Sequence, residues 1–244
     1  MYSASISTNK LTIGYDKHVV QRDLNFELHH GEMVCMLGPN GCGKSTLLRT
    51  LAGLQPTLAG SFEIANSPLP IAKLVNRGFM VVPHGEVQIQ DKRHLYAHGG
   101  EDKFFEQASE RNTFEYKGVK IQLLVCYDLR FPAWARNQSG YDYDIILVVA
   151  NWPDIRIQYW DALVAARAIE NQCYIAAVNC VGDDGMGLHY NGHSVAYNTR
   201  LEDMAAFADN EEGTHIVDFD IPALYHFREV LPLWKDRDEF EIKI

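Results

Sequence analysis

Stretches of alternating or continuous apolar residues in the first third of the chain predict strands followed by one helix. Residues 10–15 and 24–28 alternate apolar and polar positions, as half-buried strands do. Residues 33–37 form a short apolar run that is typical of a buried strand. Good helix formers with helical spacing occupy residues 47–54. This order of elements indicates a compact β/α unit.

The remaining two thirds of the chain show a second set of elements. The predicted elements are a hairpin with strands starting at 78–83 and 87–90, an apolar strand at 121–125, a helix from Ala133 and a helix over 161–171, and residues 145–150 form the densest short apolar run. Between the two sets, Pro68 and Pro70 interrupt any continuous element. We therefore place a boundary between residues 1–74 and residues 75–244 and expect an α/β protein.

Composition excludes several classes of protein. The chain has 22 Lys plus Arg against 32 Asp plus Glu, a net charge of −10, which argues against a nucleic-acid binder. Hydrophobic residues make up 47% of the sequence, enough for a sizeable core. No apolar run approaches the length of a membrane span, and the first ten residues contain no apolar signal core. We expect a cytoplasmic protein without direct membrane insertion.

The cysteines and histidines give no metal or disulfide pattern. Five cysteines occur without a CxxC pair, and the ten histidines lack metal-ligand spacing. An odd number of unpaired cysteines leaves one of them available as a reactive thiol.

A glycine-rich segment follows the predicted strand at 33–37. Residues 38–46 match the pattern GxxxxGK[ST] and precede the predicted helix. Glycines let backbone N–H groups turn toward an anion at a helix N-terminus, and Lys44 adds a full positive charge. The alternative is a strand-to-helix turn without a ligand. The complete pattern in this context favours a phosphate loop.

Residues 10–66, including GYDKHVVQRDLNFELHH and GEMVCMLGPNGCGKSTLLRTLAGL, resemble the ATPase subunits of ABC transporters. The resemblance implies that Tyr15 stacks on adenine and that Mg-ATP binds with Ser45 as the magnesium ligand. The candidate nucleotide-binding residues are Tyr15, Gly38, Asn40, Gly41, Gly43, Lys44, Ser45 and Thr46. No LSGGQ-like signature or paired Asp-Glu follows, so we expect no ATP-driven power stroke.

Cys126 ends the predicted buried strand 121–125, just before the predicted helix from Ala133. At the tip of a strand beside a helix start, a thiolate can be exposed and stabilised. The alternative is an inert cysteine that fills space in the core. Similarly, the charged cluster DKRHLY at 91–96 reads by itself as a solvated strand end.

Several separated motifs decide between these alternatives, namely DKRHLY, Gly100-Glu101, CYDLRFP, ANWP and AARAIENQCYIAAVNCVG. Together they make residues 75–244 resemble the nitrilase, or carbon-nitrogen hydrolase, superfamily, and within it the omega-amidase-like members. The resemblance implies that Cys126 is the nucleophile, Lys92 the lysine of a Glu-Lys-Cys triad and Glu101 an assisting second glutamate. It also implies an αββα sandwich that commonly forms a dimer, a small amide substrate and no cofactor.

The sequence departs from that family at its first glutamate, the general base. This residue ends an early strand in the family, where the present chain carries the ABC-like segment. Glu63 and Glu86 are the nearest carboxylates, and we expect both to be solvated. The fold prediction is thus an incomplete nitrilase-like αββα sandwich with an N-terminal P-loop β/α fragment.

Two functions follow from these resemblances. The first is thiol-dependent hydrolysis of a small terminal amide to an acid and ammonia, with an incomplete triad, in which Lys92 stabilises the oxyanion and lowers the thiol pKa. The alternative is an ATP-binding module with the remainder as scaffold.

Other residues are expected to be structural. Trp152, Tyr159 and Trp160 read as core more readily than as an acyl pocket. Arg167 and Glu170 have the spacing of an ion pair on a helix surface.

Overall fold

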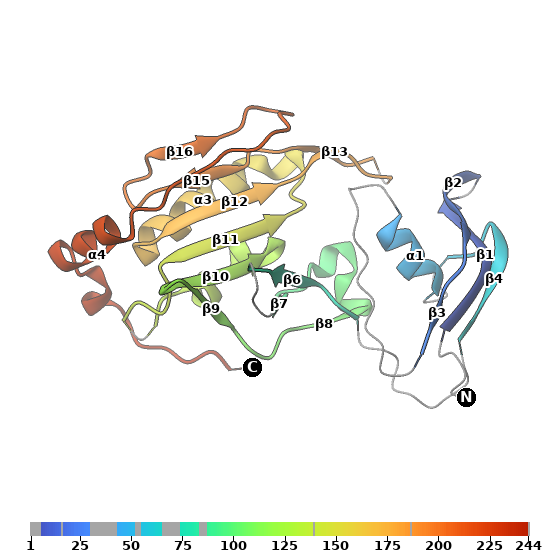
Figure 1. The fold of residues 1–244 in the computed structure, drawn as a ribbon, viewed down its shortest axis with the longest axis horizontal. Coiled ribbons are helices and arrows are strands. Elements are labelled where there is room, and N and C mark those ends of the chain that lie inside the picture. The colour runs from blue at the N-terminus through green and yellow to red at the C-terminus, as the bar shows by residue number, and fades with distance from the viewer. Residues whose placement is uncertain are drawn as a thin grey trace. The chain divides into compact units, whose positions relative to one another are not determined.

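The computed structural model describes residues 6–15, 17–29, 43–51, 55–64, 74–82, 87–138, 140–185 and 187–243. The chain divides into one unit of residues 1–71 with 183–187, and a second of residues 72–182 with 188–244 (Figure 1). The predicted strand at 33–37 lies outside the described residues.

An antiparallel sheet forms the first unit. The strands β2 (His18–Leu24), β3 (Glu27–Leu28) and β4 (Ala59–Ile64) all pair with the long strand β1 (Ile6–Tyr15). The predicted strand at 10–15 is confirmed and starts earlier. A continuous strand over 24–28 is wrong, because the Asn25 side chain accepts a hydrogen bond from the Lys10 N–H at 2.8 Å and interrupts the run.

The predicted helix after the glycine-rich segment is α1 (Lys44–Leu51), described as far as Leu51. Gly43 precedes it with φ of 97°, and a Cβ atom there would lie 2.8 Å from Val20 Cγ1. Both the backbone angle and the close approach require glycine at this position.

A mixed sheet of six strands organises the second unit. Its order is β16 (Asp203–Ala206), β15 (Val195–Tyr197), β12 (Tyr174–Asn179), β11 (Ile145–Ala150), β10 (Val119–Val125) and β9 (Thr113–Tyr116). The central β10, β11 and β12 are parallel, which confirms the predicted strand at 121–125, and the apolar run 145–150 forms β11. Continuous apolar sequences suit parallel strands because both of their faces are covered.

The helix α3 (Ile157–Asn171) lies along one face of this sheet (Figure 1). Trp160, Val164 and Ala168 are fully buried there against alternate residues of the three parallel strands. The predicted helix at 161–171 is confirmed and begins four residues earlier.

The predicted hairpin lies on the opposite face, formed by antiparallel β6 (Arg77–Met80) and β7 (Gln88–Asp91). A Cβ atom on Gly78 would be 2.6 Å from Leu123 Cδ2, so the hairpin packs tightly on β10. On the same face, Val149 and Val178 are 43% and 59% exposed. The hairpin therefore covers only part of this face, as expected for an incomplete sandwich.

Short elements complete the unit. They are β5 (Leu74–Val75) with β8 (Phe105–Glu106), β13 (Val181–Asp183) with β14 (His189–Asn191), the 3-10 turns η1 (Ala97–Gly99), η2 (Glu101–Lys103), η3 (Cys126–Arg130), η4 (Asp154–Arg156) and η5 (Leu233–Asp236), and the helices α2 (Pro132–Ala135) and α4 (Ile221–Val230). The helix predicted from Ala133 is thus a single turn.

The burial of the three aromatic residues and of the predicted ion pair matches the sequence predictions only in part. Trp152 and Trp160 are buried, whereas Tyr159 is exposed. Arg167 does bind Glu170 at 2.9 Å, but a surface pair is wrong because Arg167 is buried and also donates to the Leu129 carbonyl at 2.8 Å. The bond from Arg167 to Leu129 joins α3 to η3.

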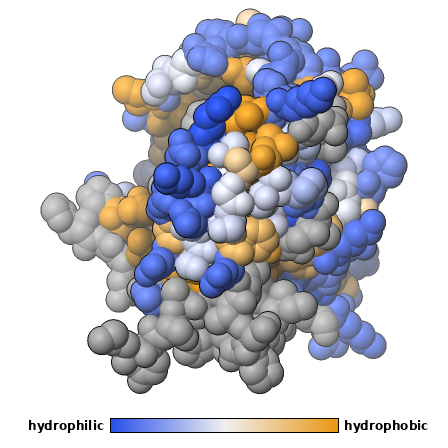
Figure 2. Space-filling model, turned by 90° about the vertical axis from the view of Figure 1, so that its right-hand side faces the viewer, coloured by the Kyte–Doolittle hydropathy of each residue, from blue (hydrophilic) through white to orange (hydrophobic). Residues whose placement is uncertain are grey.

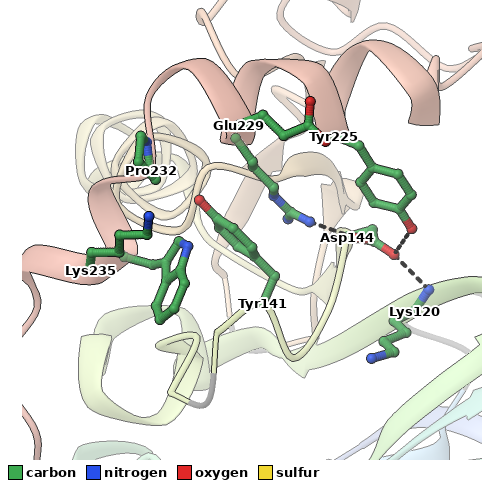
Figure 3. A pocket seen from close by; sticks show the side chains of 9 residues that line it. Lys120, Tyr141, Asp144, Tyr225, Glu229, Pro232 and Lys235 are labelled. Carbon is green, nitrogen blue, oxygen red and sulfur yellow. Dashed lines mark hydrogen bonds and ion pairs between the residues drawn. The ribbon is translucent and has the colours of Figure 1, made fainter.

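Helix α4 is fastened to the sheet by a buried ion pair (Figure 3). Arg228 Nη1 lies 2.6 Å from Asp144 Oδ1, and the guanidinium also donates to the carbonyls of Tyr143 and Gln172 at 2.9 Å each. Tyr225 donates to the other oxygen of Asp144 at 3.2 Å. Asp144, Tyr225 and Arg228 are among the residues that line a cavity of about 550 Å³, and the charges of Asp144 and Arg228 are paired with each other.

The molecular surface mixes polar and apolar side chains on the face shown in Figure 2. Among the described residues, no helix is both long enough and apolar enough to span a membrane.

Replacing Asp144 with Asn should lower the free energy of unfolding by about 3 kcal/mol, because the buried Arg228 guanidinium then lacks its counter-charge. Urea unfolding measures this change. Asp203→Asn, an exposed carboxylate of the same sheet, serves as the control and should change stability by less than about 0.5 kcal/mol. Equal effects of the two substitutions would contradict the role of the pair.

Candidate active site

Lys92 immediately follows β7, and its side chain is almost completely buried. Its ammonium Nζ lies 2.6 Å from Glu101 Oε2. The same carboxylate oxygen accepts the Tyr96 N–H at 2.7 Å. A buried ammonium is tolerated only with such a partner, so Glu101 fixes where the charge of Lys92 sits.

Cys126 immediately follows β10 and begins η3. Its φ of 47° lies in the left-handed region that residues other than glycine rarely adopt. The thiol is half-buried and donates to the Asn151 carbonyl at 3.8 Å. The strand end and the unusual turn together present one sulfur atom at the edge of the sheet.

Electrostatics connects the three residues. Burial raises the pKa of the Cys126 thiol above its usual value, and the positive charge of Lys92 opposes this effect. Glu101 and Asp128 act with burial to raise the pKa of the thiol. The expected lowering by Lys92 is present, but a net depressed pKa is wrong because desolvation of the thiolate is the larger effect.

The turn η3, which begins at Cys126, ends at a guanidinium that lies close to aromatic rings. The Arg130 guanidinium lies 5.0 Å from the centre of the Trp152 ring and 5.1 Å from that of Tyr159. Lys92 Nζ lies 6.0 Å from the centre of the Tyr127 ring. Tyr159 was expected in the core, and the structure instead places it beside Arg130.

Sequence reasoning assigned no role to Asp128 or Arg130. Asp128 has no exposed surface, although it is charged and stands two residues after the candidate nucleophile. That combination of residue type and position in CYDLRFP was the available signal.

The candidate nucleotide site is described only in part. Thr46 donates to the Tyr15 hydroxyl at 3.0 Å, so these two predicted residues lie together, while Gly43 precedes α1 and Lys44 begins it. Predicted site residues or side chains outside the described part are Gly38, Asn40, Gly41 and the side chain of Ser45.

Two further features concern the carboxylates that could replace the general base and the groups that could bind a metal. Glu63 is exposed on β4, as expected, and Glu86 lies outside the described residues. Within the described ranges, no group of three His, Cys, Asp or Glu side chains could hold a metal ion.

Residues 59–229 match the family described as "Carbon-nitrogen hydrolase". The chain belongs to this family. The omega-amidase YafV of Escherichia coli (strain K12) is 46% identical over 169 residues, which are 69% of this chain and 65% of that protein. The 2-oxoglutaramate amidase of Bacillus subtilis is 35% identical over 145 residues, 59% of this chain and 55% of that protein. The chain therefore spans less than two thirds of the length of these relatives.

Two solved structures are similar to this chain in both sequence and fold. A carbon-nitrogen hydrolase superfamily protein of Xanthomonas campestris has a TM-score of 0.66 at 38% identity, covering 71% of this chain and 68% of that one. A mutant amidase of Nesterenkonia, at 28% identity and a TM-score of 0.53 over 64% of this chain and 61% of that one, shows a Michael addition of acrylamide at its active-site cysteine.

Part of the chain is also similar to a transport ATP-binding protein. The maltose/maltodextrin import ATP-binding protein MalK of Salmonella paratyphi A is 39% identical over 79 residues, 32% of this chain and 21% of that protein.

Replacing Lys92 with Met should raise the pKa of Cys126 further, because the cation that favours the thiolate is removed. The rate of Cys126 alkylation by acrylamide, measured against pH, should shift to higher pH. Lys103→Met, at an exposed position of η2, is the matched control and should leave the profile in place. An unchanged profile in Lys92→Met would contradict the electrostatic coupling.

Proposed function

We propose that the chain hydrolyses the terminal amide of a small substrate to an acid and ammonia, with Cys126 as the nucleophile. The observation that carries this proposal is the buried Lys92 ammonium, held by Glu101 and acting on the charge of the Cys126 thiol. The names of the relatives, an omega-amidase and a 2-oxoglutaramate amidase, support the same chemistry.

In the first step the thiolate attacks the amide carbonyl carbon and forms a carbon–sulfur bond. The carbonyl oxygen becomes an oxyanion, which the Lys92 ammonium stabilises. The carbon–nitrogen bond then breaks. The nitrogen takes up the proton that the Cys126 thiol lost on becoming a thiolate and leaves as ammonia, so that Cys126 carries the acyl group as a thioester.

In the second step a water molecule loses a proton to a base while it attacks the thioester carbon; the carbon–sulfur bond then breaks, the acid leaves and the sulfur takes back the proton. Glu101 Oε2 is engaged by Lys92 and Tyr96, but no described residue donates to its Oε1. Both oxygens of Asp128, the other carboxylate acting on the thiol, accept hydrogen bonds. We assign the water-activating role to Glu101 in the absence of the family's first glutamate.

The substrate class follows from the surroundings of Cys126. Among the described residues, no carboxylate pairs with the Arg130 guanidinium, which lies among aromatic rings at the end of η3. A guanidinium in this setting suits a carboxylate on the substrate. The proposed substrate is therefore a short chain with a terminal amide at one end and a carboxylate at the other.

The same proposal includes the domain boundaries, the location, the oligomeric state and the cofactor requirement predicted from the sequence. Residues 75–244 form the hydrolase portion without its N-terminal strands, and residues 1–74 are an ABC-ATPase-like P-loop fragment. A cytoplasmic homodimer is the expected state. The hydrolase portion requires no cofactor.

Ammonia release from small ω-amides tests the hydrolase. Release should be abolished in Cys126→Ala and retained in Cys180→Ala, which removes another half-buried thiol. Release that persists without Cys126 would refute the proposal.

Glu101→Gln separates the two steps. It should leave at most one ammonia per chain and a stable thioester detectable by protein mass, because water is no longer activated. Sustained turnover in this variant would remove Glu101 from the base role.

A second candidate function is nucleotide binding by the first unit. The MalK similarity and the contact between Tyr15 and Thr46 beside the start of α1 favour it. We propose Mg-ATP as the ligand, with Lys44 on its phosphates and Ser45 on magnesium.

Saturating Mg-ATP should raise the melting temperature by several degrees, following the linkage of binding and stability. The shift should disappear in Lys44→Ala and remain in Lys17→Ala, an exposed lysine of the same unit. No shift in the parent chain would exclude nucleotide binding.

A further inference from the structure

The carboxylate of Asp128 connects the two segments that carry Lys92 and Cys126. Its Oδ1 accepts the His94 N–H at 2.8 Å, and its Oδ2 accepts the Arg93 N–H at 3.4 Å. The same Oδ2 accepts the Val125 N–H at 3.3 Å. One side chain thus binds the residues next to Lys92 and the residue next to Cys126.

These contacts join the segment after β7 to the end of β10, whereas other side-chain hydrogen bonds of β7 lead to Asn112, just before β9. The Lys92 N–H donates to the Asn76 carbonyl at 2.7 Å, and its carbonyl accepts from the Ala108 N–H at 3.0 Å, so its own backbone is bonded to segments other than β10. Cys126 instead continues β10 of the six-stranded sheet. Packing alone lets such segments shift by fractions of an ångström, whereas shared hydrogen bonds set their relative position.

The side chain of His94 reinforces the connection. Its Nδ1 lies 2.9 Å from Asp128 Oδ1, and its ring stacks on Phe131 at 3.7 Å between centroids with an interplanar angle of 5°. Trp134 meets the same ring edge-on at 6.0 Å. The ring therefore has little freedom, and neither has the carboxylate that it contacts.

We propose that Asp128 is a positioning residue that holds the Lys92 ammonium in register with the Cys126 thiol. This inference rests on the proposed function. Asp128 itself does not touch the substrate. Without its carboxylate, Lys92 would remain buried beside Glu101, but its distance and direction to the sulfur would no longer be fixed.

A positioning role of Asp128 and a purely electrostatic role predict opposite changes in the rate of Cys126 alkylation. The negative charge of Asp128 disfavours the thiolate, so removing it by itself would speed alkylation of Cys126. If Lys92 is no longer aligned with the sulfur, the thiolate loses its cation and alkylation of Cys126 becomes slower. The sign of the change therefore separates the two roles.

The test compares Asp128→Asn with Asp144→Asn. Both substitutions neutralise a buried carboxylate, but Asp144 precedes β11 and contacts Arg228 rather than the thiol segment. Acrylamide alkylation of Cys126, followed by peptide mass from pH 6 to 10, is measured below the melting temperature of both variants. Asp128→Asn should slow alkylation about tenfold near pH 7 and move the profile about one pH unit upward. Asp144→Asn should leave the profile in place.

A milder variant covers the case in which Asp128→Asn does not fold. His94→Gln removes the imidazole contact and keeps the backbone donors, and it should slow alkylation in the same direction by a smaller factor. Faster or unchanged alkylation in the folded variants would overturn the proposal. Alkylation needs no amide substrate, so failure of ammonia release in the parent chain would refute the proposed function separately.

Discussion

Burial of the Lys92 ammonium is the constraint around which the candidate site is built. A cation withdrawn from water must meet a carboxylate within hydrogen-bond distance, and Glu101 meets it at 2.6 Å. Glu101 in turn is oriented by the Tyr96 N–H, which belongs to the segment between β7 and η2. The Lys92 charge therefore constrains the path of the chain from 92 to 101, together with the Asp128 contacts to Arg93 and His94.

The parallel strands place buried carboxylates at both of their ends. Asp144 precedes β11 and binds α4 through Arg228, while Asp128 follows β10 and binds the segment after β7. Each compensates backbone or side-chain donors that hydrophobic packing would leave unsatisfied. The apolar middle of the sheet supplies stability, and the charged ends determine which elements dock there.

The sequence could predict those parts of the fold that depend on local pattern. The apolar runs 121–125 and 145–150 became central strands, and separated motifs identified Lys92, Glu101 and Cys126 before any geometry was known. The contact of Lys92 with Glu101 is in the structure, but the catalytic roles remain proposals. The strand at 24–28 and the surface position of Arg167 were mispredicted, because a side-chain cap and a tertiary contact to Leu129 decided them. Likewise, the thiol pKa depends on the depth of burial, which residue order does not encode.

The left-handed backbone of Cys126 implies a compromise between reactivity and folding. A residue with a Cβ atom at φ of 47° costs roughly 1 kcal/mol that glycine would not incur. The most stable sequence at this position is thus one that carries no sulfur at all. A cysteine there reduces stability in return for a thiol held at the edge of the sheet, and a library selected for thermal tolerance alone would be expected to discard it.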